Sequence, residues 1–124
     1  MATTTLFDRA GGMPFFERLV GRFYDAVSTD PILRPLYPER DLAPAQRRLT
    51  LFLAQYWGGP RTYDDERGHP RLRMRHAPFV IDVAARDRWL SLMRAALAAE
   101  APPPDVAAQL DAYLEMAAEA MRNR

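Results

Sequence analysis

Both histidines of the chain, His69 and His76, lie in one short segment with the sequence "GHPRLRMRHAPF". The same segment carries three arginines at every second position, namely Arg71, Arg73 and Arg75. Three interpretations compete for such a segment. The first is a basic loop that binds nucleic acid, and the second is a solvated surface loop. The third is a site where one imidazole holds a group that the arginines help to anchor.

The charge pattern argues against nucleic acid. Five arginines between residues 61 and 75 are opposed by the carboxylates of Asp64, Asp65 and Glu66, which leaves a net of about two positive charges. Nucleic-acid modules usually combine a broader basic stripe with aromatic residues on which bases stack. Tyr63 is the one aromatic residue nearby. We therefore expect no nucleic-acid partner.

A bare metal site is also poorly supported. Structural and catalytic zinc needs three or four protein ligands, whereas the chain has two histidines and no cysteine. Haem brings four nitrogens of its own and needs a single protein imidazole. Residues 72–76 can form one helical turn that ends before Pro78, which places His76 on a helix. His69 precedes Pro70, which favours an extended conformation, and has no assigned role.

Three polar aromatic side chains occur at positions that would otherwise be apolar. Tyr24 and Trp89 lie on helical apolar stripes, and Tyr37 lies in "PLYPE" between two prolines. Buried phenols and indoles need hydrogen-bond partners. Each could reach a backbone carbonyl or the surface, or all three could point toward one acceptor with partial negative charge, such as bound dioxygen. The residues alone leave both alternatives open.

Composition excludes several other kinds of chemistry. The 124 residues suffice for one domain with a continuous core, and 17 basic against 16 acidic residues give no strong overall field. Without cysteine there are no disulfides, thiolate nucleophiles or iron–sulfur clusters. All basic residues are arginine, so a P-loop lysine and an internal Schiff base are excluded. The bias toward Arg, Ala and Pro favours a GC-rich bacterial genome.

Apolar residues recur at helical spacing along most of the chain, which predicts an all-α fold with four main helices. Thr5 and Asp8 are spaced like a capping box for a short first helix, and Pro14 suits the first turn of the next. Residues 58–82 form a connection longer than compact domains usually contain, which favours a functional segment. No stretch is apolar for ~20 residues and no secretion signal is recognisable, so we expect a cytoplasmic protein without a membrane span.

At this point the sequence resembles the truncated haemoglobins of group II, the truncated haemoglobin O subfamily. The resemblance runs from about Leu6 to Met121. It depends mainly on "LFLAQYWGGPRTYDDERGHPRLRMRHAPF", supported by "GG", "RFY", "LYP" and "RDRWL". It implies an all-α, shortened globin fold, a two-on-two helical sandwich, with residues 1–124 as a single truncated globin domain. In such a globin the long connection would replace most of the proximal helix.

The resemblance also assigns roles to individual residues. His76 matches the iron ligand, and we expect its second ring nitrogen to donate to a backbone carbonyl, with that of Leu72 as the candidate. Four residues match the distal ligand-binding positions: Tyr24, Tyr37, Ala45 and Trp89. Six more are expected to contact the haem or its propionates: Arg48, Leu49, Phe52, Arg75, Phe79 and Met93.

The implied function is reversible binding of dioxygen, and of ligands such as nitric oxide and carbon monoxide, at the ferrous iron of haem b. The alternative is a redox enzyme on the same haem, a nitric oxide dioxygenase or a peroxidase-like protein served by an unidentified reductase. Oxygen transport, redox chemistry and ligand sensing stay open at this point, as does assembly into a homodimer.

Overall fold

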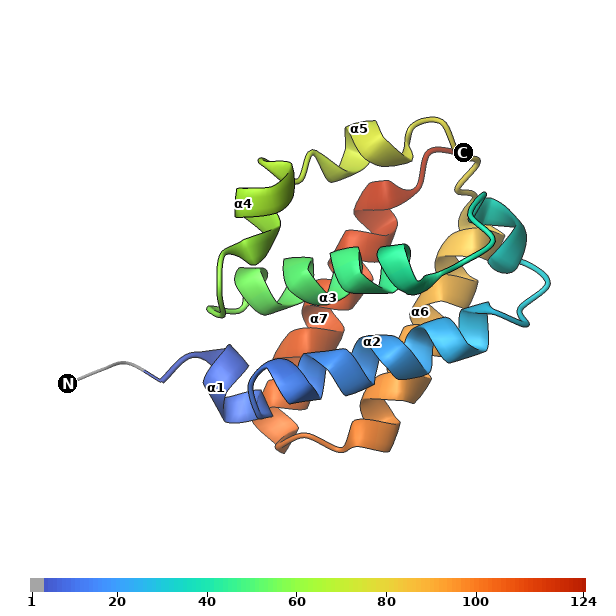
Figure 1. Ribbon diagram of the computed structural model, residues 1–124. Helices are drawn as coiled ribbons and strands as arrows, with labels where there is room; N and C mark the ends of the chain where they lie inside the picture. Colours follow the sequence, from blue (N-terminus) through green and yellow to red (C-terminus); the bar gives the residue numbers. More distant parts are fainter. Residues whose placement is uncertain (1–3) are drawn as a thin grey trace.

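The computed structural model describes residues 4–124, and four long helices form its framework (Figure 1). These are α2 (Met13–Val27), α3 (Ala43–Tyr56), α6 (Val83–Glu100) and α7 (Pro104–Met121). Helix α2 packs against both α3 and α6, and α6 packs against α7. Within the described residues all regular structure is helical, which confirms the all-α class and the two-on-two helical arrangement.

The first helix is short and carries the expected caps. In α1 (Leu6–Ala10), the Thr5 hydroxyl accepts a hydrogen bond from the Asp8 amide at 3.1 Å, and the Asp8 carboxylate accepts one from the Thr5 amide. Gly11 ends the helix with φ of 120°, a backbone conformation that residues with a Cβ rarely adopt. Pro14 then lies in the first turn of α2, where its missing N–H costs nothing. Both sequence predictions are confirmed.

The apolar stripe of α2 forms the centre of the hydrophobic core. Six of its side chains are at most 2% exposed: Phe15, Phe16, Leu19, Val20, Phe23 and Val27. Truncating one buried phenylalanine of this kind to alanine typically costs about 3–5 kcal/mol. The core therefore fixes the position of α2, from which Tyr24 reaches toward the functional site.

A buried carboxylate closes the corner after α2. Asp30 accepts hydrogen bonds from the backbone amides of Ile32 and Leu33, at 3.0 and 2.9 Å, and forms an ion pair with Arg88 of α6. These contacts hold the start of the turn that leads into the short helix η1 (Arg34–Leu36). Because the ion pair joins residues far apart in the chain, local sequence patterns do not predict it.

The long connection contains two short helices, α4 (Thr62–Arg67) and α5 (Leu72–His76). The predicted turn at residues 72–76 is confirmed, whereas α4 was expected to be irregular. Gln55 of α3 holds α4 by two hydrogen bonds of 2.9 Å to Asp64, one to its backbone amide and one to its carboxylate. The connection is thus anchored to the framework.

Asn123, near the C-terminus, fastens the segment that follows α5. Its backbone and side chain exchange two hydrogen bonds of 2.9 Å with the backbone of Ile81, and its amide donates to the Phe79 carbonyl at 2.8 Å. Figure 1 places the C-terminus beside this segment, between α5 and α6. Asn123 therefore fixes the segment that directly follows His76.

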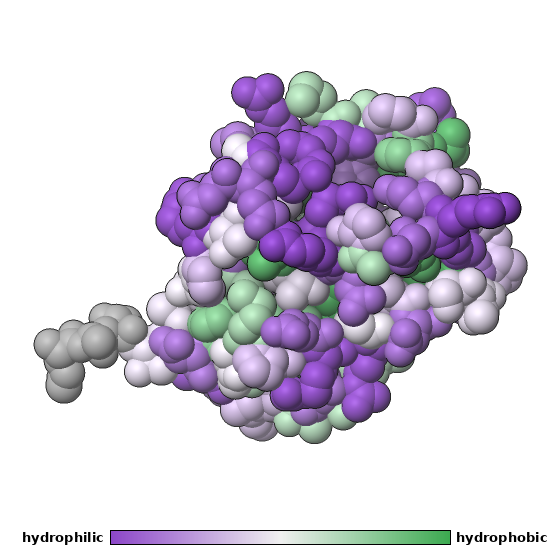
Figure 2. All heavy atoms as spheres, viewed as in Figure 1, coloured by the Kyte–Doolittle hydropathy of each residue, from purple (hydrophilic) through white to green (hydrophobic). Residues whose placement is uncertain are grey.

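The face shown in Figure 2 is covered mainly by polar and charged side chains, with small apolar patches among them. None of the helices in residues 4–124 combines the length and the apolar character needed to cross a membrane.

Candidate functional site

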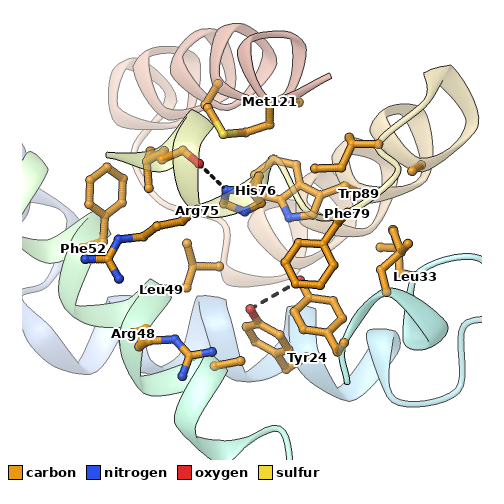
Figure 3. A pocket seen from close by; sticks show the side chains of 18 of the residues that line it. Tyr24, Leu33, Arg48, Leu49, Phe52, Arg75, His76, Phe79, Trp89 and Met121 are labelled. Atoms are coloured by element: carbon orange, nitrogen blue, oxygen red, sulfur yellow. Dashed lines mark hydrogen bonds between the residues drawn. The ribbon is translucent and has the colours of Figure 1, made fainter. Parts of the chain in front are cut away.

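A cavity of about 580 Å³ is lined by residues of α2, α3, α6 and α7 and of the short helices α4 and α5 (Figure 3). Its volume lies in the range usual for small-molecule and cofactor sites. Ten of the residues singled out in the sequence line it: Tyr24, Tyr37, Ala45, Arg48, Leu49, Phe52, Arg75, His76, Phe79 and Trp89. They come from six different elements or loops, so the fold, and not sequence proximity, brings them together.

The orientation of His76 is fixed by its own helix. Its Nδ1 lies 2.6 Å from the carbonyl oxygen of Leu72, one turn earlier in α5. A carbonyl oxygen can only accept, so Nδ1 carries a hydrogen, and in the neutral imidazole the lone pair is on Nε2. The ring borders the cavity, where Nε2 is available as a metal ligand (Figure 3). The contact to Leu72 is the one expected from the sequence.

Two tyrosines meet at another wall of the cavity. The hydroxyls of Tyr24 and Tyr37 are 3.4 Å apart, and their rings pack edge to face with centroids 5.6 Å apart. Burial raises the pKa of Tyr24 well above its ordinary value, and the neighbouring Tyr37 adds to this effect. Burial likewise raises the pKa of Tyr37. Both phenols are therefore neutral at physiological pH and can donate hydrogen bonds.

Trp89 contributes a third donor from α6. Its ring contacts Phe23 edge to face at 5.5 Å, which fixes the indole against the core. Among the side chains drawn in Figure 3, the hydrogen bonds join Tyr24 with Tyr37 and His76 with Leu72, and the indole takes part in neither. An indole N–H can only donate. Trp89 therefore presents a donor without a protein acceptor among those residues.

Helix α3 supplies an apolar wall and a cation. Ala45 and Leu49 are one turn apart on the same face of the helix, and Ala45 offers no polar group to the cavity. Arg48 donates to Glu39 at 3.2 Å. On the other side, Arg75 donates to the carbonyls of Pro70 at 2.8 Å and Arg67 at 3.3 Å.

Taken together, the cavity combines apolar walls, one oriented imidazole and two guanidinium groups. Each guanidinium has five N–H donors and uses only some of them in the contacts described above. Such a donor set suits a flat apolar ring system that carries a metal and peripheral carboxylates, which is the chemical character of haem. The residues present therefore fit this cofactor.

Comparison with known proteins agrees with this chemistry. The sequence profile of the bacterial-like globin family matches residues 5–123, which is nearly the whole chain. The chain belongs to this globin family.

Individual relatives place the globin more narrowly. The group 2 truncated hemoglobin YjbI of Bacillus subtilis (strain 168) is 39% identical over 113 residues, which cover 91% of this chain and 85% of that protein. A thermostable hemoglobin from the actinobacterium Thermobifida fusca is 57% identical, with a TM-score of 0.95 over 97% of this chain and 98% of that one. A truncated oxygen-avid haemoglobin from Bacillus subtilis is 37% identical, with a TM-score of 0.91 over 97% and 100% of the two chains. The protein is a truncated haemoglobin of group II.

Membership of this family implies that the chain carries haem and binds small diatomic ligands such as dioxygen. The cavity of this globin is lined by residues whose chemistry suits that function. These lining residues include one histidine with a fixed ring orientation, two neutral phenols, an indole and several arginines.

Met93 is the one predicted site residue that is not among the residues lining the cavity. This side chain is completely buried in the core and does not line the cavity of the globin. It lies one helical turn after Trp89 on the same face of α6, so periodicity alone cannot distinguish the cavity wall from the core. Met93 is therefore a core residue in this structure, and its expected contact with the cofactor stays a prediction.

His69 is exposed and lies outside the cavity lining. Its Nδ1 accepts a hydrogen bond from the Arg71 backbone amide at 3.2 Å, within the turn that precedes α5. Its contact is thus to the loop and not to the cavity.

Several lining residues of this globin were missed in the sequence. Glu39 follows Tyr37 in a loop, and Tyr63 lies on the unpredicted helix α4. Tyr113 and Met121 belong to the apolar stripe of α7, which gave no sign that part of it faces a cavity. For Glu39, a lone acid in a proline-rich loop carries no signal that could have found it.

Proposed function

We propose that this globin binds haem b through His76 and holds dioxygen reversibly under hydrogen bonds from Trp89, Tyr24 and Tyr37. The observation that carries the proposal is the 2.6 Å contact between His76 Nδ1 and Leu72, which leaves Nε2 free at the cavity. Bound haem supplies the ferrous iron at which a diatomic ligand is coordinated.

His76 acts as more than a point of attachment. The carbonyl of Leu72 accepts the Nδ1 proton and thereby fixes both the tautomer and the ring plane. A hydrogen bond of this kind also makes the imidazole more basic, so that it donates electron density more readily. That property favours ligands which draw charge onto themselves, as dioxygen does.

The distal donors are available for such a ligand. A separation of 3.4 Å between the hydroxyls of Tyr24 and Tyr37 exceeds the usual 2.5–3.0 Å for O–H···O bonds, so this contact is weak. Either phenol can leave it for a stronger acceptor in the cavity. Trp89 can donate to the same acceptor from α6.

The remaining contacts concern retention of the cofactor. Leu49, Phe52 and Phe79 provide apolar surface for the faces and edges of the ring system. Arg48 and Arg75 have free donors with which to bind its carboxylates. The description of the similar Bacillus subtilis protein as oxygen-avid supports dioxygen as the ligand.

The test is optical. Protein purified with sufficient haem should give a Soret band, and the reduced form should give distinct difference spectra with oxygen and with carbon monoxide. Pyridine haemochrome analysis identifies the haem as type b. A haem-saturated preparation without a Soret band would contradict haem binding, and an oxygen complex that does not reverse on deoxygenation would contradict reversible binding.

A further inference from the structure

The arginines around α5 differ from most others of the chain in having no carboxylate partner. Ten of the seventeen arginines form ion pairs within residues 4–124. Of the seven others, four lie between residues 67 and 75: Arg67, Arg71, Arg73 and Arg75. Guanidinium groups without an ion pair are thus concentrated around the helix that carries His76.

Three of these four side chains are available to a partner. Arg67, Arg71 and Arg73 are exposed, whereas Arg75 is partly buried and donates to backbone carbonyls. Arg71 adopts φ of 46° and ψ of 50°, the left-handed region that favours glycine. The local backbone therefore does not account for an arginine at this position, whereas a role of its charge does.

Neighbouring carboxylates do not neutralise this surface. On α4, Asp64 and Glu66 form ion pairs with Arg61 and Arg47, respectively. Asp65 is then the one acidic residue of this helix without an ion pair in the described chain. Helix α7 packs against α5, and all four of its carboxylates form ion pairs with arginines outside residues 67–75: Asp105, Asp111, Glu115 and Glu119. The surface around α5 therefore keeps a net positive charge, which attracts negatively charged partners.

An exposed apolar side chain lies among these charges. Met74, between Arg73 and Arg75 in α5, is 61% exposed, the largest value for a large apolar residue in residues 4–124. Methionine and arginine are both enriched where proteins contact one another, because a flexible apolar side chain and a planar cation suit many partner surfaces. We call Arg67, Arg71, Arg73 and Met74 the basic patch.

The basic patch is separated from the haem cavity by one helix. Leu72, Arg75 and His76 line the cavity from α5, while Arg73 and Met74 of the same helix are exposed to solvent. Figure 1 shows α4 and α5 along one edge of the molecule, away from α1 and α2. A protein bound at this edge is therefore close to the imidazole that we assign to iron.

We propose that the basic patch docks an acidic one-electron donor protein of the ferredoxin type, which reduces ferric haem across α5. The proposal rests on haem binding through His76, as proposed above, because dioxygen binds to ferrous iron. The reduced donor loses one electron, ferric haem gains it and becomes ferrous, and no bond forms or breaks. The arginines speed the encounter and orient the donor, and Met74 adds apolar contact.

Charge and size favour this partner over other anionic macromolecules. Transient redox complexes use interfaces of less than about 1,200 Å², for which a patch of four side chains can form the centre. Nucleic-acid sites add exposed aromatic rings for stacking, whereas Tyr63, the one tyrosine, tryptophan or phenylalanine of α4 and α5, is buried. Stable attachment to an anionic membrane needs more apolar or lipid anchoring than Met74 supplies.

Binding is tested with a plant-type ferredoxin, an acidic iron–sulfur protein, as the probe. Isothermal titration calorimetry measures its dissociation constant from the ferric, haem-loaded protein at low and at physiological ionic strength. We expect binding that weakens with salt and that falls about tenfold in Arg71→Gln/Arg73→Gln. Arg9→Gln/Arg18→Gln is the matched control: it removes the same charge from exposed side chains of α1 and α2 and should bind as wild type does.

The apolar contact has its own matched pair. Met74→Gln should weaken ferredoxin binding, whereas Met116→Gln changes a side chain of α7 that is 59% exposed and should leave binding unaltered. Stopped-flow absorbance then measures the second-order rate of haem reduction by reduced ferredoxin. This rate should fall in parallel with binding in the variants of the basic patch. Reduction by dithionite at high ionic strength, which needs no docking surface, should proceed equally fast in all variants.

The outcomes separate the two proposals. Absence of a Soret band overturns haem binding and this inference together. A normal Soret band without ferredoxin binding at low ionic strength, or with equal binding in wild type and Arg71→Gln/Arg73→Gln, overturns the docking surface and leaves haem binding intact.

Three further results would also overturn the docking surface. An equal loss of binding in Arg9→Gln/Arg18→Gln would show that overall charge decides. Slower reduction by dithionite in the patch variants would place the effect at the haem. Binding of the wild type to phosphatidylglycerol vesicles in place of ferredoxin would assign the basic patch to a membrane surface.

Discussion

Arg48 Nη2 lies 3.2 Å from Glu39 Oε1 at the edge of the cavity, while the other oxygen of that carboxylate is buried without a hydrogen-bond partner among the described residues. A haem propionate arriving beside Arg48 would bring a second carboxylate to the same guanidinium. Glu39 would then compete with that propionate for Arg48 and repel it.

This competition predicts opposite effects for the two partners. Arg48→Ala should accelerate haem loss by up to about fivefold, since ion pairs of this exposure contribute ~0–1 kcal/mol. Glu39→Gln should slow haem loss, because it removes the repulsion and keeps the shape. Transfer of haem to apomyoglobin measures both rates. Faster loss from Glu39→Gln would mean that the carboxylate mainly positions Arg48.

Arg75 gives a second and independent prediction. Its Nε and Nη2 donate to the carbonyls of Pro70 and Arg67, so Arg75→Ala removes a loop contact as well as a cation that we expect near the propionates. Haem loss should accelerate at least as much as in Arg48→Ala. Arg73→Ala, which alters an exposed side chain of the same helix outside the cavity lining, is the control. Equal rates for Arg75→Ala and wild type would show that the propionates bind elsewhere.

The two histidines form a matched pair for testing iron ligation. His76→Ala should abolish the iron–histidine stretch in resonance Raman spectra of the ferrous protein, since His69 is exposed and bonded within its own turn. His69→Ala should leave the stretch unchanged. Haem can remain in the apolar cavity of either variant, so haem retention does not decide the matter. An unaltered stretch in His76→Ala would refute the assignment.

Local sequence patterns predicted those parts of the fold that depend on contacts between residues close together in the sequence. The Thr5–Asp8 cap, the turn at residues 72–76 and the His76–Leu72 contact each join residues three or four positions apart. Spacing of this kind is fixed by helix geometry, so sequence can specify it.

The features that escaped prediction depend on residues distant in sequence. Asp30 forms an ion pair with Arg88, and the Asn123 side chain accepts a hydrogen bond from the Ile81 amide. No local sequence pattern predicts either pairing. Met93 shows the complementary difficulty, since one apolar face of α6 serves both the core and, at Trp89, the cavity wall. The tertiary arrangement decides which role each apolar residue takes.

The Asp30–Arg88 pair makes stability depend on pH. Burial alone would raise the pKa of Asp30, but hydrogen bonds from Leu33, Ile32 and Arg88 outweigh it and hold the pKa below the usual 3.8. A carboxyl group whose pKa is lower in the folded than in the unfolded state stabilises the folded protein at pH values above its unfolded-state pKa. This stabilisation is lost as the pH falls through the folded-state pKa.

Asp30→Asn should therefore lower Tm by several degrees at neutral pH, with the difference from wild type shrinking in acid. Thermal unfolding followed by circular dichroism across this pH range measures it. Asp87→Asn is the control, because Asp87 is exposed and pairs with Arg86 at the surface. A pH-independent difference for Asp30→Asn would mean that the lost contacts, and not the charge, determine stability.

Trp89 provides the sharpest test of the distal donors. If the indole only packs against Phe23, Trp89→Phe keeps most of the apolar volume and ligand release should hardly change. If it donates to dioxygen, the variant loses a hydrogen bond to a partly charged acceptor, worth ~1.5–3 kcal/mol. We expect oxygen release to become roughly ten to a hundred times faster. Carbon monoxide carries less negative charge when bound, so its release should change less. Stopped-flow release rates for both gases measure this, and equal acceleration of the two would indicate a more open cavity and not a lost donor.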